Sequence, residues 1–138
     1  MKTPHAVLLV LTAGFVLAAD NPKEDAAKKD REKLAGTWKV TSAERDGQPD
    51  KVSKDAVTTY TADGKFTVKF ADGTSGEGTY QLDPGKKPKA IDYTKNNGPN
   101  KGKPHEGIYS LEGDTLKICR SDPGKPRPKE MVTDCRTR

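Results

Sequence analysis

Few residues of this 138-residue chain have the chemistry of a catalytic site. Of its two histidines, only His105 lies beyond the apolar N-terminal stretch. A general base needs a positioned partner and a substrate site, and the neighbours Pro104 and Glu106 supply no nucleophile at a telling spacing. The residues therefore predict no catalytic group, and they indicate a protein that is not an enzyme.

Two cysteines, Cys119 and Cys135, are the other reactive side chains. In an oxidising compartment they could form a disulfide, which would stabilise the fold by about 3 kcal/mol. A hairpin through residues 122–124 would instead place Cys119 opposite a residue nearer Glu130. Both a Cys119–Cys135 disulfide and a free, buried Cys119 therefore stay open. The spacing of His105 and the cysteines matches no zinc-ligand pattern, so we predict no metal and no cofactor.

A glycine-rich stretch, Gly73-Thr74-Ser75-Gly76-Glu77-Gly78, has the composition of a phosphate-binding loop. Such loops precede a helix and use its N-terminus. Here the alternating pattern of a strand follows, so the stretch is interpreted as a hairpin turn.

The first 18 residues have the pattern of a signal peptide. Lys2 precedes an apolar run from Ala6 to Leu17, and Val16-Leu17-Ala18 offers small residues at a cleavage site. The run is shorter than the ~20 apolar residues of a membrane span. We expect cleavage after Ala18, an extracytoplasmic (periplasmic or secreted) protein, and no stable membrane anchor after cleavage.

The formal net charge is +5, but the lysines are dispersed among Pro, Gly and Asn residues. Nucleic-acid binders concentrate positive charge on one face and interleave it with aromatic residues. This chain lacks that pattern, so we predict no nucleic-acid partner. The charge does not indicate an oligomeric state.

We expect residues 19–33 to form a short helix with its linker, and residues 34–138 to form one β domain. Asn21 and Pro22 form a helix start, acidic residues follow, and basic residues crowd the C-terminal half. Beyond Gly36, about eight short alternating segments are separated by turn residues such as Asp63-Gly64. This spacing favours an up-and-down antiparallel barrel or a sandwich. Of the two we expect the small barrel, which needs no exposed strand edge.

Trp38 is the only tryptophan and opens the first of these segments. Its ring would plug one end of a barrel if the indole N–H finds a partner. We expect inward-facing residues to fill the barrel or to line a ligand pocket, with Val57 also facing inward. The candidate ligand-binding residues are Trp38, Val40, Phe66, Val68, Phe70, Tyr80, Ile91, Tyr93, Ile108, Leu116 and Ile118.

The segment Leu34-Ala35-Gly36-Thr37-Trp38-Lys39-Val40 resembles the opening of the lipocalin-like domain of secreted planctomycete proteins. The resemblance continues through Gly78-Thr79-Tyr80 and Gly107-Ile108-Tyr109 to Gly113-Asp114-Thr115-Leu116-Lys117-Ile118-Cys119. It implies a calycin-type barrel and an exported protein, in a family without a settled activity. Gly36-Thr37-Trp38 also resembles the wider lipocalin Gly-x-Trp signature. That resemblance implies that Trp38 packs against an arginine late in the chain, for which Arg136 is the candidate.

Two functions are compatible with these sequence features. The first is a non-catalytic domain that binds a small apolar or amphipathic ligand inside the barrel, by analogy of fold. The alternative is a structural or interaction module of the cell envelope. It would bind a protein or an anionic polymer through lysine-rich loops or through an open strand edge.

Overall fold

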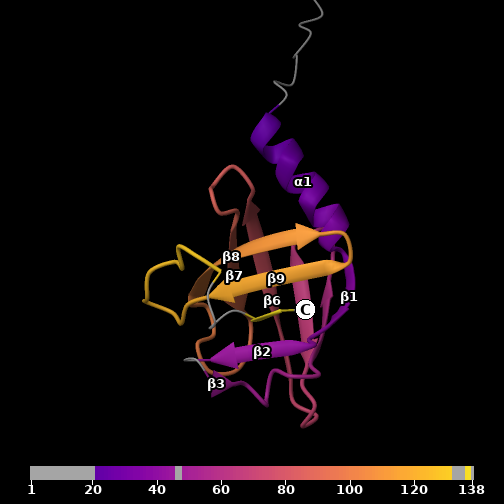
Figure 1. The fold of residues 1–138 in the computed structure, drawn as a ribbon, viewed down its shortest axis with the longest axis vertical. Helices are drawn as coiled ribbons and strands as arrows, with labels where there is room; N and C mark the ends of the chain where they lie inside the picture. The colour runs from indigo at the N-terminus through magenta and orange to yellow at the C-terminus, as the bar shows by residue number, and fades with distance from the viewer. Residues whose placement is uncertain (1–20, 46–47, 132–135, 138) are drawn as a thin grey trace, which may run out of the picture.

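The computed structural model describes residues 21–45, 48–131 and 136–137. Within these residues one helix precedes ten strands, which form a single antiparallel sheet in the order β1-β4-β5-β6-β7-β8-β9-β10-β2-β3. Figure 1 shows the sheet curling round on itself, with α1 above it. The predicted all-β fold with an N-terminal helix is confirmed.

The helix and the ten strands have the following bounds: α1 (Pro22–Leu34), β1 (Gly36–Lys39), β2 (Ser42–Arg45), β3 (Gln48–Pro49), β4 (Val57–Tyr60), β5 (Lys65–Lys69), β6 (Ser75–Asp83), β7 (Ala90–Lys95), β8 (Pro104–Glu112), β9 (Thr115–Arg120) and β10 (Arg136–Thr137).

The barrel closes through its first two strands. Only Val40 and Thr41 separate β1 from β2, yet the two strands lie near opposite ends of the strand order. β1 pairs with β4, whereas β2 pairs with β10, which pairs in turn with β9. The continuous stretch from β1 to β2 therefore connects the two ends of the strand order and closes the sheet into a barrel.

The helix forms where the sequence predicts it. The Asn21 side chain accepts a hydrogen bond from the Lys23 backbone N–H, and Pro22 occupies the first turn. Acidic residues lie in the first turn and basic residues in the last, as the helix dipole favours. Gly36 follows with a φ of 128°, a conformation that residues with a Cβ rarely adopt, and starts β1.

The hairpin turns also follow the prediction. Asp63-Gly64 connects β4 to β5 and Asp72-Gly73 connects β5 to β6, with Gly64 and Gly73 at positive φ. Each hairpin keeps strict alternation, so that Phe66 and Val68 of β5 are buried while their neighbours are exposed. The core therefore lies inside the curled sheet. Its buried members are Leu34, Val40, Ala43, Ala56, Tyr60, Phe66, Val68, Tyr80, Leu82, Ile91, Tyr93, Tyr109, Leu116 and Ile118.

The prediction that Ile108 faces into the barrel is wrong. The register pairs Ile108 with Ala90 and Cys119, whereas the inward Ile118 pairs with Tyr109. Ile108 is fully buried but lies outside the core cluster, on the outer face of the sheet. The segment after β9 lies on that face. There, the Arg127 guanidinium donates a 2.6 Å hydrogen bond to the Gly107 carbonyl oxygen.

The inward assignment of Val57 is also wrong, because β4 has the opposite parity. Thr58 and Tyr60 are each 1% exposed, whereas Val57 is 36% exposed. Thr58 pairs with Trp38 and with Val68, which places it on the inner face. In β4 the threonine is therefore buried, although hydrophobicity alone predicts that the neighbouring valine is the buried residue.

Candidate functional site

Aromatic side chains fill the middle of the barrel. The Tyr60 ring lies edge-to-face with Tyr80, and the Phe66 ring lies edge-to-face with Tyr93, each pair with ring centres 5.3 Å apart. The Tyr60 and Tyr93 hydroxyl oxygens are 2.8 Å apart and hydrogen-bonded. Gly78 faces Phe66 from β6, and a Cβ there would collide with the Thr94 carbonyl oxygen. The middle of the barrel is therefore packed protein.

The helix closes one end of the barrel. Trp38 donates a 2.8 Å hydrogen bond from Nε1 to the carbonyl oxygen of Leu34, the last residue of α1. Leu34 itself is 1% exposed and packs in the core. The indole N–H thus finds its partner at the end of the helix. The side chain of Arg136, the candidate for packing against Trp38, lies outside the described residues.

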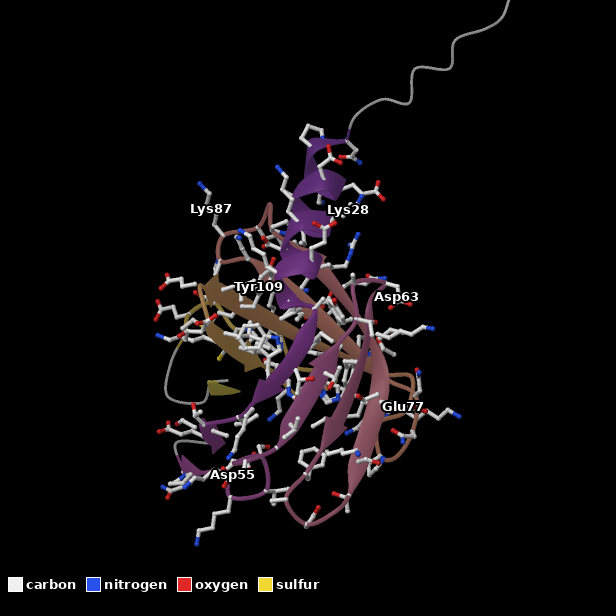
Figure 2. The ribbon with its side chains drawn as sticks, turned by 90° about the vertical axis from the view of Figure 1, so that its right-hand side faces the viewer. Lys28, Asp55, Asp63, Glu77, Lys87 and Tyr109 are labelled. Atoms are coloured by element: carbon white, nitrogen blue, oxygen red, sulfur yellow. The ribbon has the colours of Figure 1, made fainter. Side chains whose placement is uncertain are left out.

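A buried carboxylate fastens the helix to the sheet. Asp30 of α1 accepts a 2.6 Å hydrogen bond from the Tyr109 hydroxyl and a 2.9 Å bond from the Lys89 ammonium group. Burial would raise the pKa of Asp30, but the bonds to Tyr109 and Lys89 lower it overall. Burial and the bond to Asp30 raise the pKa of Tyr109. Figure 2 shows Tyr109 just below the helix.

Three basic side chains gather at the opposite end. Lys95 ends β7, His105 is the second residue of β8, and Arg120 ends β9. Because neighbouring strands run antiparallel, these three positions meet at the end of the barrel away from α1. The Arg120 guanidinium lies 5.8 Å from the centre of the Tyr93 ring, within cation–π range.

A small cavity of about 20 Å³ lies at this end. That volume is enough for about one water molecule. Its wall combines apolar side chains with two residues that carry a hydroxyl, Ser53 and Tyr93, and with two cations. The lining residues are Val40, Ser53, Ala56, Phe66, Val68, Phe70, Tyr93, Lys95 and Arg120.

Comparison with known proteins identifies the family to which this chain belongs. Residues 34–125, two thirds of the chain, match the lipocalin-like domain family. The chain belongs to that family. No curated protein and no solved structure matches it.

In this lipocalin-like domain His105 is held neutral. The side chain is 5% exposed, and no described residue hydrogen-bonds to its Nε2 atom. Burial lowers the pKa of His105, and the positive charges of Arg120 and Lys95 lower it further. The imidazole therefore contributes an unbonded polar atom, rather than a third positive charge, to the end away from the helix.

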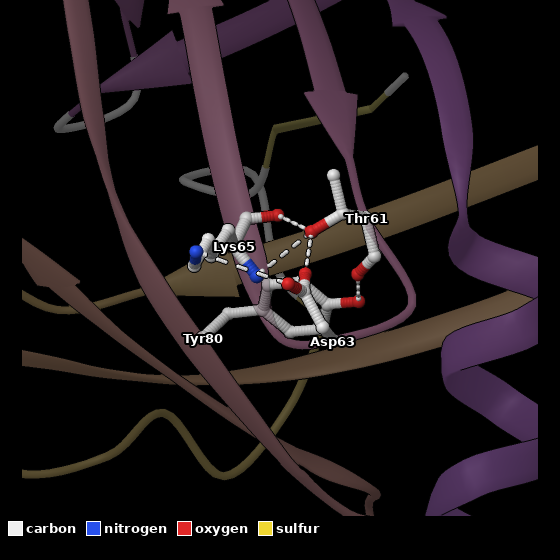
Figure 3. A network of polar contacts seen from close by, with 4 residues as sticks. All are labelled: Thr61, Asp63, Lys65 and Tyr80. Carbon is white, nitrogen blue, oxygen red and sulfur yellow. Dashed lines mark hydrogen bonds and ion pairs between the residues drawn. The ribbon is translucent and has the colours of Figure 1, made fainter.

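An open crevice of about 690 Å³ runs between α1, the turn that joins β4 to β5, and strand β6. Arg31, Asp63 and Tyr80 are among the residues that line it. Figure 3 shows the polar contacts beside it. The Tyr80 hydroxyl donates a 2.6 Å bond to the Thr61 carbonyl oxygen, and the Thr61 hydroxyl donates to Asp63. Burial raises the pKa of Tyr80 to about 12. These groups hold the turn together, because an Asp side chain in a turn favours local hydrogen bonds.

The structure brings five of the predicted ligand-binding residues together around the small cavity: Val40, Phe66, Val68, Phe70 and Tyr93. Trp38, Tyr80, Ile91, Leu116 and Ile118 belong to the remaining core or pack against it. Sequence reasoning missed the cations Lys95 and Arg120. Both continue an inward alternation, two residues after Tyr93 and Ile118 respectively, and that parity is the signal that could have found them.

Cys119 is 2% exposed and is not a free thiol. Cys135 lies outside the described residues, so the Cys119–Cys135 disulfide stays a prediction. The described residues contain no cluster of three or more His, Cys, Asp or Glu side chains suited to a metal ion. No helix in this part of the chain has the length and apolar character needed to span a membrane.

Proposed function

We propose that this lipocalin-like domain is a non-catalytic binding module. It takes a small amphipathic ligand into the barrel at the end opposite α1. The observation that carries the proposal is the wall of the small cavity, where Phe66, Val68 and Phe70 lie beside Lys95 and Arg120. Apolar walls with a few convergent polar groups are typical of ligand sites.

The cavity must enlarge to admit such a ligand. Its volume of about 20 Å³ is far below the ~300 Å³ at the low end of ligand pockets. Phe70 and Lys95 are only partly buried, unlike Phe66 and Val68 deeper in the wall. We infer that Phe70 turns outward and that the apolar part of the ligand takes its place against Phe66.

The two cations favour a ligand with an anionic head. Lys95 and Arg120 both border the cavity, and His105 next to them is held neutral by burial. A carboxylate, sulfate or phosphate head would form charge-assisted hydrogen bonds with these side chains, which are stronger than bonds between neutral groups.

The tyrosine hydroxyls of the barrel bond to other groups of the protein. Tyr60 and Tyr93 bond to each other, Tyr80 bonds to the Thr61 carbonyl oxygen, and Tyr109 bonds to Asp30. Each hydroxyl thus has a structural partner within the barrel or on the helix.

We also propose that the protein is exported and that residues 1–18 are removed. The basic start, the apolar run and the small residues at the end of that segment support this. N-terminal sequencing of the protein recovered outside the cytoplasm should begin at Ala19. Recovery of the chain with Met1 intact would contradict the proposal.

The ligand proposal is tested by thermal unfolding with decanoate and with uncharged 1-decanol. Decanoate should raise the Tm of the wild-type protein by several degrees, because it binds the folded state alone. Decanol should raise it less.

Arg120→Met keeps an apolar stem and should abolish the preference for decanoate. Lys117→Met, at an exposed position of the same strand, should keep it. Each shift is compared with the unliganded Tm of that variant. No shift with either compound, or an undiminished decanoate shift in Arg120→Met, would overturn the proposal.

A further inference from the structure

The imidazole of His105 faces the inside of the barrel at the end away from α1. His105 pairs directly with Tyr93 of β7, whose ring belongs to the core. Residues directly opposite each other in an antiparallel pair lie on the same face of the sheet. His105 is buried, and no described residue hydrogen-bonds to its Nε2 atom. A buried polar atom without a partner costs free energy, so Nε2 is a candidate contact for a ligand.

The tautomer of the ring makes this atom an acceptor. Burial lowers the pKa of His105, whereas a hydrogen bond with the Ser121 backbone raises it. A bond that raises the pKa favours the protonated ring, so the ring donates an N–H to the Ser121 carbonyl oxygen. Because Nε2 has no partner among the described residues, Nδ1 makes this bond. A neutral imidazole carries only one N–H, so Nε2 keeps a lone pair and accepts hydrogen bonds.

The polar side chains that line the cavity are either cations or already bonded hydroxyls. Lys95 and Arg120 carry donors only. The Ser53 hydroxyl donates a 2.7 Å bond to a carboxylate oxygen of Asp50, and the Tyr93 hydroxyl is bonded to another tyrosine. The imidazole therefore differs from its neighbours, because it offers an acceptor that the described residues leave without a bond.

We propose that the ligand carries a hydroxyl group next to its anionic head and that His105 accepts the hydrogen bond of this hydroxyl through Nε2. The inference rests on the proposed function, because it needs an anionic head beside Lys95 and Arg120. An ammonium group is excluded as the donor, since both cations would repel it. His105 is not among the residues that line the small cavity, so the hydroxyl reaches it in the enlarged cavity.

The ligand class is therefore an amphipathic hydroxy acid. Its alkyl chain packs against Phe66, its carboxylate bonds to Lys95 and Arg120, and its hydroxyl on carbon 2 or 3 bonds to His105. A buried acceptor discriminates against an analogue that lacks the hydroxyl, because the acceptor is then left unpaired.

The probes are decanoate, 2-hydroxydecanoate and 3-hydroxydecanoate, titrated calorimetrically into the full chain at about pH 8, where the imidazole is neutral. At least one hydroxy acid should bind about tenfold more tightly than decanoate. An apolar site would give the opposite order, because the added hydroxyl must leave water. Equal or tighter binding of decanoate would overturn this inference and leave the ligand proposal standing. Binding of none of the three acids would overturn both.

The variants test whether His105 is the acceptor. His105→Phe keeps a ring without nitrogen and should bring the three Kd values within about twofold of one another. His105→Leu is a second variant without an acceptor, and His105→Gln, which supplies a carbonyl oxygen, should recover part of the preference. Circular dichroism checks that each variant folds.

Thr58→Val is the matched control. The Thr58 hydroxyl is also buried on the inner face without a partner among the described residues, and valine has nearly the same shape. This variant should keep the preference for the hydroxy acid. A preference that survives in His105→Phe or His105→Leu, or one that Thr58→Val abolishes, would overturn the assignment of His105.

Discussion

The two ends of the barrel place polar groups in different settings. At the helix end, Asp30 is bonded to Tyr109 and Lys89, and Trp38 is bonded to Leu34. At the other end, Lys95 and Arg120 border a cavity, and His105 keeps an Nε2 atom to which no described residue bonds. Polar groups that bond to one another stabilise a fold, and polar groups that converge beside a cavity can also contact a ligand. The helix end therefore serves stability, and the opposite end is the one at which we propose that a ligand binds.

The largest expected difference between the ends is in packing. Leu34→Ala removes a side chain that is 1% exposed and should lower the free energy of unfolding by about 2–5 kcal/mol. Phe70→Ala, at the partly exposed rim of the cavity, should cost less than half as much. Urea denaturation of both variants measures this. Equal losses would mean that the cavity end is as tightly packed as the helix end.

The buried carboxylate should give the next largest effect. Asp30→Asn weakens the bonds from Tyr109 and Lys89 and should cost about 1–3 kcal/mol at neutral pH. Asp25→Asn, on an exposed position of the same helix, serves as the control and should have little effect.

The pH dependence identifies the Asp30 contribution. The pKa of Asp30 is lower in the folded state, so its stabilisation is present above the unfolded pKa of about 3.9. It is lost as the pH falls through the folded pKa. The difference between wild type and Asp30→Asn should therefore shrink below about pH 4. A difference that stays constant from pH 7 to pH 2 would contradict the assigned role.

The smallest effect should come from His105, in a different pH range. Its pKa is lower in the folded state, so its contribution to stability is complete above the unfolded pKa of about 6.5. That contribution declines as the pH falls below this value, because the unfolded chain then binds more protons. Wild type should lose stability between pH 7 and pH 5, and His105→Asn should lose less. Identical slopes for the two proteins would show that the imidazole is not buried in neutral form.

The sequence predicted the architecture well because local signals and the fold agree. Asn21 and Pro22 start the helix, and Asp63-Gly64 makes the first tight hairpin, as their turn and capping chemistry requires. The way in which the barrel closes was harder to predict from the sequence. A single predicted strand through Val40 bends into β1 and β2, and only the pairing of β2 with β10 shows how the sheet closes.

The candidate site was harder to predict than the fold. Ile108 and Tyr109 are adjacent and both are buried, so hydrophobicity does not decide which faces inward. The segment carrying Arg127 lies against the outer face and bonds to the Gly107 carbonyl oxygen and to Asp92, so a residue on that face is also covered. Lys95 and Arg120 were missed because a cation on the inner face of a barrel contradicts the simple alternation of apolar and polar residues. Such departures are expected at functional sites.

The most direct test of the proposed division between the two ends is to map where a ligand binds. Decanoate titrated into the ¹⁵N-labelled protein should shift the amide signals of Phe70, Lys95 and Arg120 and leave those of Asp30 and Tyr109 in place. Shifts concentrated instead at α1 and the adjacent crevice, around Arg31 and Tyr80, would place binding at the helix end and contradict that division.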